Sequence, residues 1–417
     1  MPSADRHVLI VGDPNGMPLL LWQTGSAVST SVIGTARELA AEKGVREHHA
    51  VLLVEETDGP EKLVELARRI HRDRPLTNVV SLGDRCVRHA AAVAEDLGLP
   101  GGHTYRTAVT AHHKGQWRDA MAEAGVEHVP HATVTDGADV VRFGDRYGWP
   151  LIVKPAIQAG AHGLTKVEGP VGAADAVGWA RQHVRVPGDD IVVEPYIDGE
   201  HYIASTFSEA GEHVVVTVAR FTFDPPHMTM SYSETPGVVD SETGAAIEAH
   251  VIRALDAVGM VNGPASVEVR IGPDGPRTIE CQLRTEGDDV WREILATTGV
   301  NLPELWARQL IGRPVLARLR RRLETPRPPW TSVKRPVYAS VPGVLQSVAG
   351  LADAANARGV VRIATFAAPG EPVRRPDSHF SKVAHVICEA DTAVEAVRLA
   401  EQAARRISIV TEPEAQA

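Results

Sequence analysis

The sequence predicts a mixed protein in which a parallel α/β region is followed by antiparallel α+β regions. In roughly the first hundred residues, short apolar runs alternate with helix-like segments, a pattern typical of a parallel sheet covered on both faces. Further along, strands with period-two alternation indicate antiparallel sheets. A chain of 417 residues is longer than one typical domain, so we expect two or three domains.

The N-terminal region is expected to alternate strands and helices. Its apolar runs predict buried strands at Val8–Val11, Ala50–Val54 and Asn78–Leu82. Helical spacing predicts helices at Thr30–Lys43, Pro60–Arg74 and Asp84–Leu97. The glycine-rich run 98–102 ends the last of these helices, and we place the first domain at residues 1–108.

The central region is expected to hold short helices and several antiparallel strands, over residues 109–316. Helices are predicted at 115–124 and before Gly148. Strands are predicted at 128–134, 149–155, 164–167, 191–193, 202–207, 214–221, 265–271 and 277–283. The turn Gly272–Gly275 predicts a hairpin between the last two strands. Residues 288–310 have helical character with an interruption at 298–300.

The C-terminal region, residues 317–417, is expected to be a small α+β domain. Residues 317–335 are basic and rich in proline, which predicts a connector. An amphipathic helix is predicted at Thr392–Arg406. We find no internal repeat in the sequence.

The bulk composition limits the classes of partner and the compartment. A net charge of −10 argues against a broad nucleic-acid surface, although it allows a local basic pocket. No apolar stretch approaches the roughly 18 residues of a membrane span, so no membrane partner is expected. The three cysteines, Cys86, Cys281 and Cys388, are far apart and form no disulfide framework in our interpretation. We therefore expect a cytoplasmic protein.

Two carboxylates on neighbouring strands predict a metal site. Glu268 and Glu280 lie on the two strands of the predicted hairpin, whose side chains can share one face. Their mutual repulsion would be relieved by a hard divalent cation. Gln282 follows on the same face as a further oxygen donor, and the fork of Arg284 suits an adjacent phosphate or carboxylate. The alternative is a solvated polar strand edge.

Lysines and a small-residue loop predict a phosphate site. Lys154 ends an apolar strand, and the loop that follows contains Gly160, His162 and Gly163. Its backbone N–H groups could approach phosphate oxygens, although it is not a Walker A loop. Lys114 is a second candidate cation. The alternatives are an ordinary hairpin turn and a solvated lysine at a helix start.

The strand exit at residues 192–200 is a candidate nucleotide hinge. An extended segment exposes backbone groups that can hydrogen-bond to a purine edge, and Glu200 could accept from ribose hydroxyls. The residues of this hinge are Glu194, Pro195, Tyr196 and Ile197. An ordinary strand exit would have the same pattern.

These motifs occur in one order, and together they resemble the ATP-grasp superfamily, in particular its carboxylate–amine (amino-acid or peptide) ligase branch. The resemblance covers essentially the whole chain. It implies an N-terminal pre-ATP-grasp α/β domain, a grasp of two α+β lobes with ATP between them, and a C-terminal α+β domain that completes the substrate side. The sequence departs from the family at Gln282, where asparagine is usual, and at Leu283, where proline is common.

The resemblance also implies roles for the candidate residues. Lys114 and Lys154 would bind the ATP phosphates, the glycine loop would cover them, and the hinge and Glu200 would hold adenosine. Glu268, Glu280 and Gln282 would bind magnesium. The implied cofactors are ATP and two Mg²⁺ ions, which Mn²⁺ is expected to replace. Lys154 and Arg284 would be the catalytic residues.

The family reaction is the formation of an amide through an acyl phosphate, with ADP and phosphate released. An amino acid is the expected substrate on one side. A purine-pathway or carboxylase-type enzyme is an alternative, although the Gln-Val-Glu-His run of biotin carboxylases is absent. A catalytically silent ATP-binding protein is another, and the retention of Glu268, Glu280 and Arg284 argues against it.

Four residues are candidates for contact with the small-molecule carboxylate and amine substrates. Arg220 and His227 could contact an acid, and Glu286 and Asp288 could recognise an ammonium group. The alternatives are a surface histidine in a proline-containing loop and an acidic cluster at a helix N-terminus. A homodimer is the default expectation for an oligomer.

Overall fold

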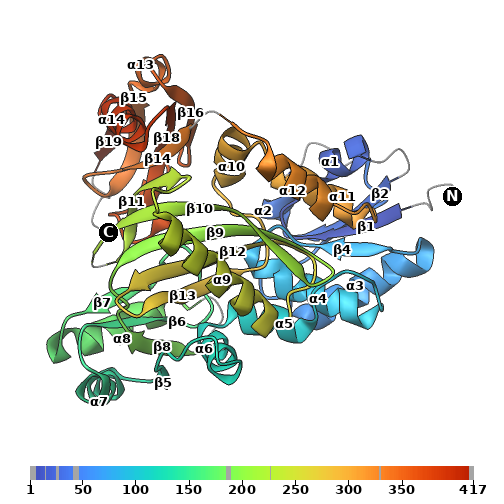
Figure 1. The fold of residues 1–417 in the computed structure, drawn as a ribbon, viewed down its shortest axis with the longest axis horizontal. Coiled ribbons are helices and arrows are strands. Elements are labelled where there is room, and N and C mark those ends of the chain that lie inside the picture. The colour runs from blue at the N-terminus through green and yellow to red at the C-terminus, as the bar shows by residue number, and fades with distance from the viewer. Residues whose placement is uncertain are drawn as a thin grey trace.

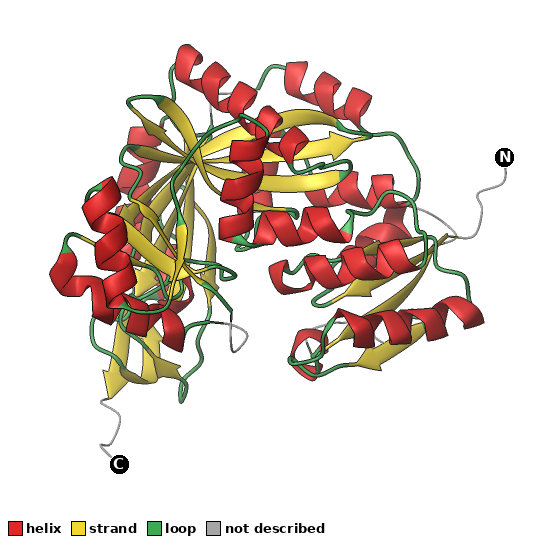
Figure 2. Cartoon of the chain, turned by 90° about the horizontal axis from the view of Figure 1, so that it is seen from below, coloured by secondary structure: helices red, strands yellow, loops and turns green. Residues whose placement is uncertain are grey.

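The computed structural model describes residues 6–14, 16–24, 28–40, 47–184, 189–225, 227–327 and 330–412. The N-terminal and C-terminal segments lie at opposite ends of the long axis, with the central strands between them (Figure 1). Seen from below, the N-terminal sheet with its helices stands beside the larger group of strands (Figure 2). No helix among the residues described is long and apolar enough to span a membrane.

The N-terminal sheet is parallel, as the sequence predicted. Its strand order is β3-β2-β1-β4, formed by β1 (Arg6–Val11), β2 (Val28–Gly34), β3 (Ala50–Leu53) and β4 (Asn78–Val80). The helices of this region are α1 (Met17–Thr24), α2 (Ala36–Leu39), α3 (Pro60–Asp73) and α4 (Val87–Asp96). A short 3-10 turn, Asp84–Cys86, precedes α4.

The helix predicted at Thr30–Lys43 is wrong for its first half. Residues up to Gly34 form β2, and α2 occupies only Ala36–Leu39; residues 41–43 lie outside the described part. Val32 and Ile33 are β-branched and fully buried between neighbouring strands, an environment that favours a strand over a helix. Helix α1 and strand β2 were not predicted.

A smaller four-stranded antiparallel sheet follows, reached through α5 (Tyr105–His112) and α6 (Lys114–Glu123). Its order is β5-β8-β6-β7, formed by β5 (Ala132–Val134), β6 (Leu151–Pro155), β7 (Thr165–Val167) and β8 (Ile191–Pro195). Helices α7 (Gly137–Tyr147) and α8 (Ala173–Gln182) bury apolar residues in one cluster with these strands. The predicted strand 128–134 is shorter than expected, because Pro130 has no N–H for the ladder.

The largest sheet has eight strands in the order β13-β12-β9-β10-β11-β14-β18-β16. These are β9 (Glu200–Glu209), β10 (Glu212–Asp224), β11 (Thr229–Thr235), β12 (Gly263–Gly272), β13 (Gly275–Gln282), β14 (Thr331–Tyr338), β16 (Val360–Thr365) and β18 (Lys382–Ala390). The predicted β12–β13 hairpin is confirmed, and α9 (Ser241–Ala257) shares a core with β9 and β12. Because β11 pairs with β14, the C-terminal strands extend the central sheet.

The remaining elements complete the C-terminal half. They are α10 (Val290–Thr298), α11 (Leu302–Leu310), α12 (Leu316–Glu324), α13 (Leu351–Ala355), α14 (Ala393–Ala404), β15 (Gly343–Ala349), β17 (Pro372–Val373) and β19 (Ser408–Glu412). The predicted interruption at 298–300 and the predicted terminal helix are confirmed. The predicted connector 317–335 is wrong, because α12 buries Leu316 and Leu319 on one face and β14 begins at Thr331.

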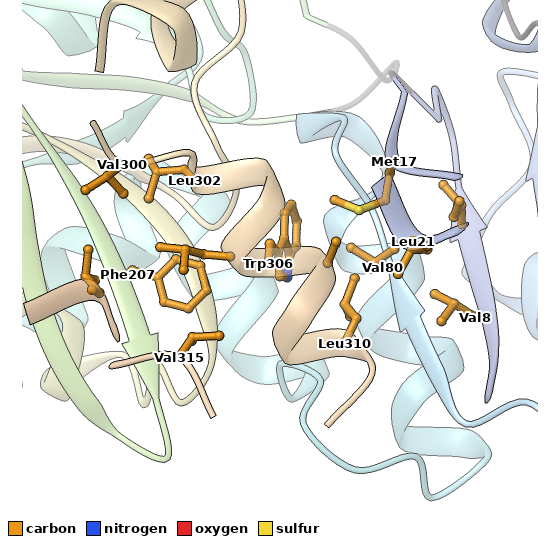
Figure 3. Packing of buried hydrophobic residues seen from close by; sticks show 14 of the residues in the cluster. Val8, Met17, Leu21, Val80, Phe207, Val300, Leu302, Trp306, Leu310 and Val315 are labelled. Atoms are coloured by element: carbon orange, nitrogen blue, oxygen red, sulfur yellow. The ribbon is translucent and has the colours of Figure 1, made fainter. Parts of the chain in front are cut away.

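A shared apolar core joins the N-terminal sheet to the large sheet. Trp306 of α11 lies between Phe207 of β9 and Val80 of β4 (Figure 3), and all three side chains belong to one buried cluster. Burial of a large apolar side chain contributes about 1.5–3 kcal/mol, so this cluster fixes the two sheets relative to each other. Cys86, Cys281 and Cys388 are all buried.

Candidate functional site

A cavity of about 490 Å³ lies between the small four-stranded sheet and the large sheet. Its wall contains side chains from both sheets and from the loops that follow β6, β8 and β13. The cavity brings together most of the residues that the sequence singled out, namely Lys114, Lys154, Gly160, His162, Glu194, Pro195, Tyr196, Ile197, Glu268, Glu280, Gln282, Arg284, Glu286 and Asp288.

Four of the candidate residues lie outside this cavity. Arg220 and Glu200 form an ion pair of 3.2 Å in a neighbouring cavity of about 290 Å³, and Arg220 is also held by Glu234 at 2.8 Å. Gly163 lies in the loop against His183 and Pro155, where a Cβ would clash with both. The Nδ1 atom of His227 lies 3.2 Å from a backbone carbonyl oxygen. These contacts occupy Arg220 and His227 with the protein itself.

The two carboxylates of the predicted metal site are direct cross-strand neighbours. Glu268 on β12 is paired with Glu280 on β13. The Nζ of Lys114 lies 3.2 Å from Oε2 of Glu280, and the Nε2 of His201 lies 3.1 Å from Oε2 of Glu268. Gln282 donates its side-chain N–H to Oε1 of Glu280 at 2.8 Å. The structure therefore collects two carboxylates and one amide on the cavity wall.

This donor set fits a magnesium ion. Among the described residues, no group of three or more His, Cys, Asp or Glu side chains is arranged to hold a metal. Mg²⁺ commonly binds through one or two carboxylates and completes its shell with water and substrate phosphates, so Glu268 and Glu280 are sufficient. In the structure, the ammonium of Lys114 and the imidazole of His201 are the nearest partners of the pair.

Lys154 is held by a buried ion-pair network. Its Nζ lies 2.6 Å from Oε1 of Glu194, and the Nε of Arg118 lies 2.9 Å from Oε2 of the same carboxylate. All three residues are at most 2% exposed. Burial opposes the charged form of Glu194, but Arg118 and Lys154 outweigh it and lower its pKa to about 2. The carboxylate of Glu194 is therefore paired within the protein. A ligand in the cavity would meet mainly the backbone of the hinge and the side chains that follow Glu194.

The sequence analysis missed Arg118 as part of this network. Arg118 lies four residues after Lys114 on α6, so the two side chains share a helix face. Its guanidinium also contacts Glu127 at 3.1 Å, and the Nε2 of His250 lies 3.1 Å from that carboxylate. The helical spacing between Lys114 and Arg118 was the available signal for Arg118. Its partners, Glu127 and Glu194, come from other segments and could not be inferred from that spacing.

The glycine loop is held from both sides. Lys114 donates to the carbonyl of Gln158 at 2.6 Å, and the N–H of His379 donates to the carbonyl of Gly160 at 2.9 Å. Gly160 has a φ of +65°, and a Cβ there would lie 2.8 Å from the ring of Phe380. The C-terminal segment therefore lies directly against the loop. Other C-terminal residues that line the cavity are Lys334, Phe366 and Lys382.

Arg284 faces a carboxylate from the N-terminal region. Its Nε lies 3.6 Å from Oδ1 of Asp84, and one of its terminal nitrogens donates to the carbonyl of Thr285 at 2.9 Å. Asp84 begins the turn before α4, and its Oδ2 lies 3.2 Å from Nε2 of His112. The sequence analysis did not identify Asp84, because its proximity to Arg284 arises only from the packing of separate segments.

The two acidic candidate residues after Arg284, Glu286 and Asp288, have different surroundings. Asp288, at φ +60°, has His379 at 3.1 Å and Lys382 at 3.3 Å. Burial opposes its charged form, but the histidine and lysine partners outweigh burial and hold its pKa far below the usual range. Glu286 has no such cationic contact in the described structure, and burial raises its pKa.

Three family models match this chain. The ATP-grasp domain matches residues 147–290, the ATP-grasp N-terminal domain matches residues 28–101, and the L-amino acid ligase C-terminal domain 2 matches residues 335–412. The two ATP-grasp models together place the chain in the ATP-grasp superfamily, and its relatives include carboxylate–amine ligases. The fold class predicted from the sequence is confirmed.

The relatives include several named ligases. An L-arginine-specific L-amino acid ligase of Bacillus subtilis is 20% identical over 72% of this chain and 73% of its own length. Alanine–anticapsin ligase of the same species is 24% identical over 59% of this chain and 55% of its own length. A D-alanine–D-alanine ligase of Ralstonia nicotianae is 30% identical over 34% of this chain and 45% of its own length.

Solved structures agree on the fold. An L-amino acid ligase from Bacillus licheniformis superposes with a TM-score of 0.82 at 19% identity, covering 98% of this chain and 99% of that one. A phosphoribosylglycinamide synthetase from Anaerococcus prevotii gives a TM-score of 0.69 at 15% identity, covering 98% and 100%. The fold is thus shared by ATP-grasp enzymes of different activities.

Proposed function

We propose that this chain is an ATP-dependent ligase that joins the carboxylate of an amino acid to an amine through an acyl phosphate. One observation supports it most directly: Lys114 and Lys154 line the same cavity as the Glu268–Glu280 pair and Arg284. The cavity therefore contains lysines for phosphates, carboxylates for magnesium and a guanidinium for an acyl phosphate.

In this proposal ATP lies between the two sheets. The backbone of residues 195–197 faces adenine, and Lys114 and Lys154 contact the phosphates beneath the loop that contains Gly160 and His162. Gly163 lets the same loop pack closely against His183 and Pro155. Glu200, in the neighbouring cavity, remains a proposed ribose contact.

Magnesium would be held by Glu268, Glu280 and Gln282. When bound, it neutralises charge on the β- and γ-phosphates of ATP. We propose two such ions and expect Mn²⁺ to replace them. Measuring ADP release against added Mg²⁺ or Mn²⁺ in chelator-treated protein tests this part.

The chemistry assigned to the chain's own residues has two steps. The substrate carboxylate attacks the γ-phosphorus of ATP, a new O–P bond forms, and the bond to ADP breaks. Arg284 then holds the acyl phosphate and stabilises the oxyanion that develops when the amine attacks its carbonyl. The loop at Gly160, held by Lys114 and His379, keeps water from the acyl phosphate.

The matched L-amino acid ligase C-terminal domain model favours an amino acid substrate over a purine or a carboxylase substrate. The names of the relatives, which include an L-amino acid ligase and an alanine–anticapsin ligase, support the same choice. We propose domains at 1–108, 109–316 and 317–417, a cytoplasmic location and, for an oligomer, a homodimer. Mass photometry of the purified chain tests the last point.

The proposed function is tested by a screen of acids against amines, monitored by phosphate release. A productive pair should release phosphate only when acid, amine, ATP and magnesium are all present. Mass spectrometry should then find one amide per ADP. If no pair of amino acids stimulates ADP formation, the ligase proposal is wrong.

A further inference from the structure

Glu286 carries an unpaired carboxylate oxygen in the wall of the candidate site. The residue is 9% exposed, lines the main cavity, and lies two residues after Arg284. The hydroxyl of Ser205 donates to its Oε1. Its Oε2 is buried and has no hydrogen-bond partner within the part of the chain that the structure describes. A buried carboxylate oxygen without a partner is costly, so a ligand with a donor group fits there.

Asp288, the other acidic candidate, cannot serve in the same way. Contacts with His379 at 3.1 Å and Lys382 at 3.3 Å already balance its charge. Burial opposes its charged form, but these histidine and lysine partners outweigh burial and hold its pKa far below the usual range. Asp288 therefore neither needs a further cation nor accepts a proton near neutral pH.

The surroundings of Glu286 favour proton uptake. Burial raises its pKa, and the opposing influences come from Ser205 on β9, Ser266 on β12 and the guanidinium of Arg284. A carboxylate whose pKa is raised binds a proton more readily than an ordinary glutamate. Its position beside Arg284 places it next to the carbonyl that the amine is proposed to attack.

We propose that Glu286 binds the ammonium group of the amine substrate through Oε2 and removes one proton from it before the attack. This assignment rests on the proposed ligase function and names a primary ammonium compound, such as an amino acid, as the second substrate. Ser205 orients the carboxylate through Oε1, so Ser205 is a positioning residue.

The proposed step is balanced. Glu286 takes one proton from R–NH₃⁺ and becomes a neutral carboxylic acid, which leaves an uncharged amine. The nitrogen lone pair attacks the acyl carbon, the C–N bond forms, and the C–O bond to the phosphoryl group breaks. Phosphate departs with the electrons of that bond and takes the second proton from nitrogen. Glu286 returns its proton to solvent when the products leave.

Hydroxylamine provides the decisive comparison, because it is uncharged at neutral pH and needs no proton acceptor. The full chain would be given ATP, magnesium and the best acid, with either an amino acid or hydroxylamine as nucleophile. In Glu286→Gln, amide formation should fall by about 10²-fold or more, in the range that general bases contribute. Hydroxamate formation should remain near the wild-type rate.

Two further measurements separate the proposed role from a general structural effect. Below the pKa of the amine, amide formation by Glu286→Gln should rise about tenfold per pH unit, because the uncharged amine becomes tenfold more abundant. Glu293→Gln is the matched control, since Glu293 is 1% exposed, pairs with Lys334 at 2.9 Å and does not line the cavity. It should keep the wild-type ratio of amide to hydroxamate.

The outcomes distinguish a failure of the role assigned to Glu286 from a failure of the proposed ligase function. If the wild-type chain forms hydroxamate and amide, but Glu286→Gln loses both equally or keeps both, the role of Glu286 is overturned and the ligase function stands. If the wild-type chain forms neither product with any acid, the proposed function fails, and the role of Glu286 fails with it.

Discussion

Glu268 and Glu280 face each other directly across the β12–β13 ladder, so two carboxylates share one point of the cavity wall. Neighbouring charges of the same sign raise the energy of the folded protein unless cations compensate them. Here Lys114 lies 3.2 Å from Glu280, and His201 lies 3.1 Å from Glu268. Because both carboxylates line the cavity, we expect them to bind a cation when the site is loaded.

The first prediction concerns Glu280. Replacement by alanine should abolish magnesium-dependent ADP release while leaving the fold intact, because the change removes a metal ligand from a cavity wall. Circular dichroism and thermal unfolding measure the fold, and a coupled assay measures ADP. Glu242→Ala, on the first turn of α9, is the control and should keep wild-type turnover. Full activity in Glu280→Ala would show that the metal assignment is wrong.

The second prediction concerns the buried network around Arg118. Arg118→Ala leaves Glu194 and Glu127 without their main cationic partner, and breaking a buried pair in this way costs about 3–5 kcal/mol. The free energy of unfolding from urea titration should fall by that amount. Arg142→Ala removes an exposed pair with Asp139 and should change stability by no more than about 0.5 kcal/mol. Equal losses in both variants would contradict a structural role of the network.

The third prediction concerns the glycine loop. In Gly160→Ala the new methyl group would meet the Phe380 ring at 2.8 Å, and the residue would be strained at φ +65°. The loop should move away from the C-terminal segment, and the KM for ATP should rise. Adding Phe380→Ala should restore part of the affinity, because it removes the clash and leaves only the backbone strain. A double variant no better than Gly160→Ala alone would argue against contact between the two segments.

The fourth prediction concerns stability at acid pH. Burial lowers the pKa of both His7 and His89 from 6.5 to about 4. The unfolded chain therefore binds these protons first, and stability should decline as the pH falls from about 6.5 to about 4. Above pH 6.5 both groups are neutral in either state and add no slope. His89→Leu should make the decline shallower, whereas His128→Leu, at an exposed position, should leave it unchanged.

Much of the fold could be predicted from local patterns. The hairpin around Gly272–Gly275, the parallel character of the first sheet and the break near Gly299 all follow from short-range signals and are present in the structure. Strand β2 was mistaken for a helix because it is a largely buried strand without a clear alternation of polar and apolar residues. Helix α12 was missed because four arginines around Leu319 looked like a solvated connector.

The candidate site was predictable only where its residues lie close in sequence. The row from Glu280 to Arg284 could be inferred from strand geometry alone. Asp84 and Phe380 come from segments far from that row, and their positions depend on how the sheets pack. Whether a buried carboxylate has a partner also depends on how distant segments pack. Glu194, near the end of β8, is held in an ion pair, whereas Oε2 of Glu286 has no hydrogen-bond partner among the described residues.

The measurement that tests the central claim most directly is ADP release by the purified chain with acid and amine supplied separately and together. We predict little ADP with ATP and magnesium alone, and a rate that rises only when both an amino acid and an amine are present, with one amide formed per ADP. ADP production at one rate regardless of amino acids and of magnesium would contradict the account.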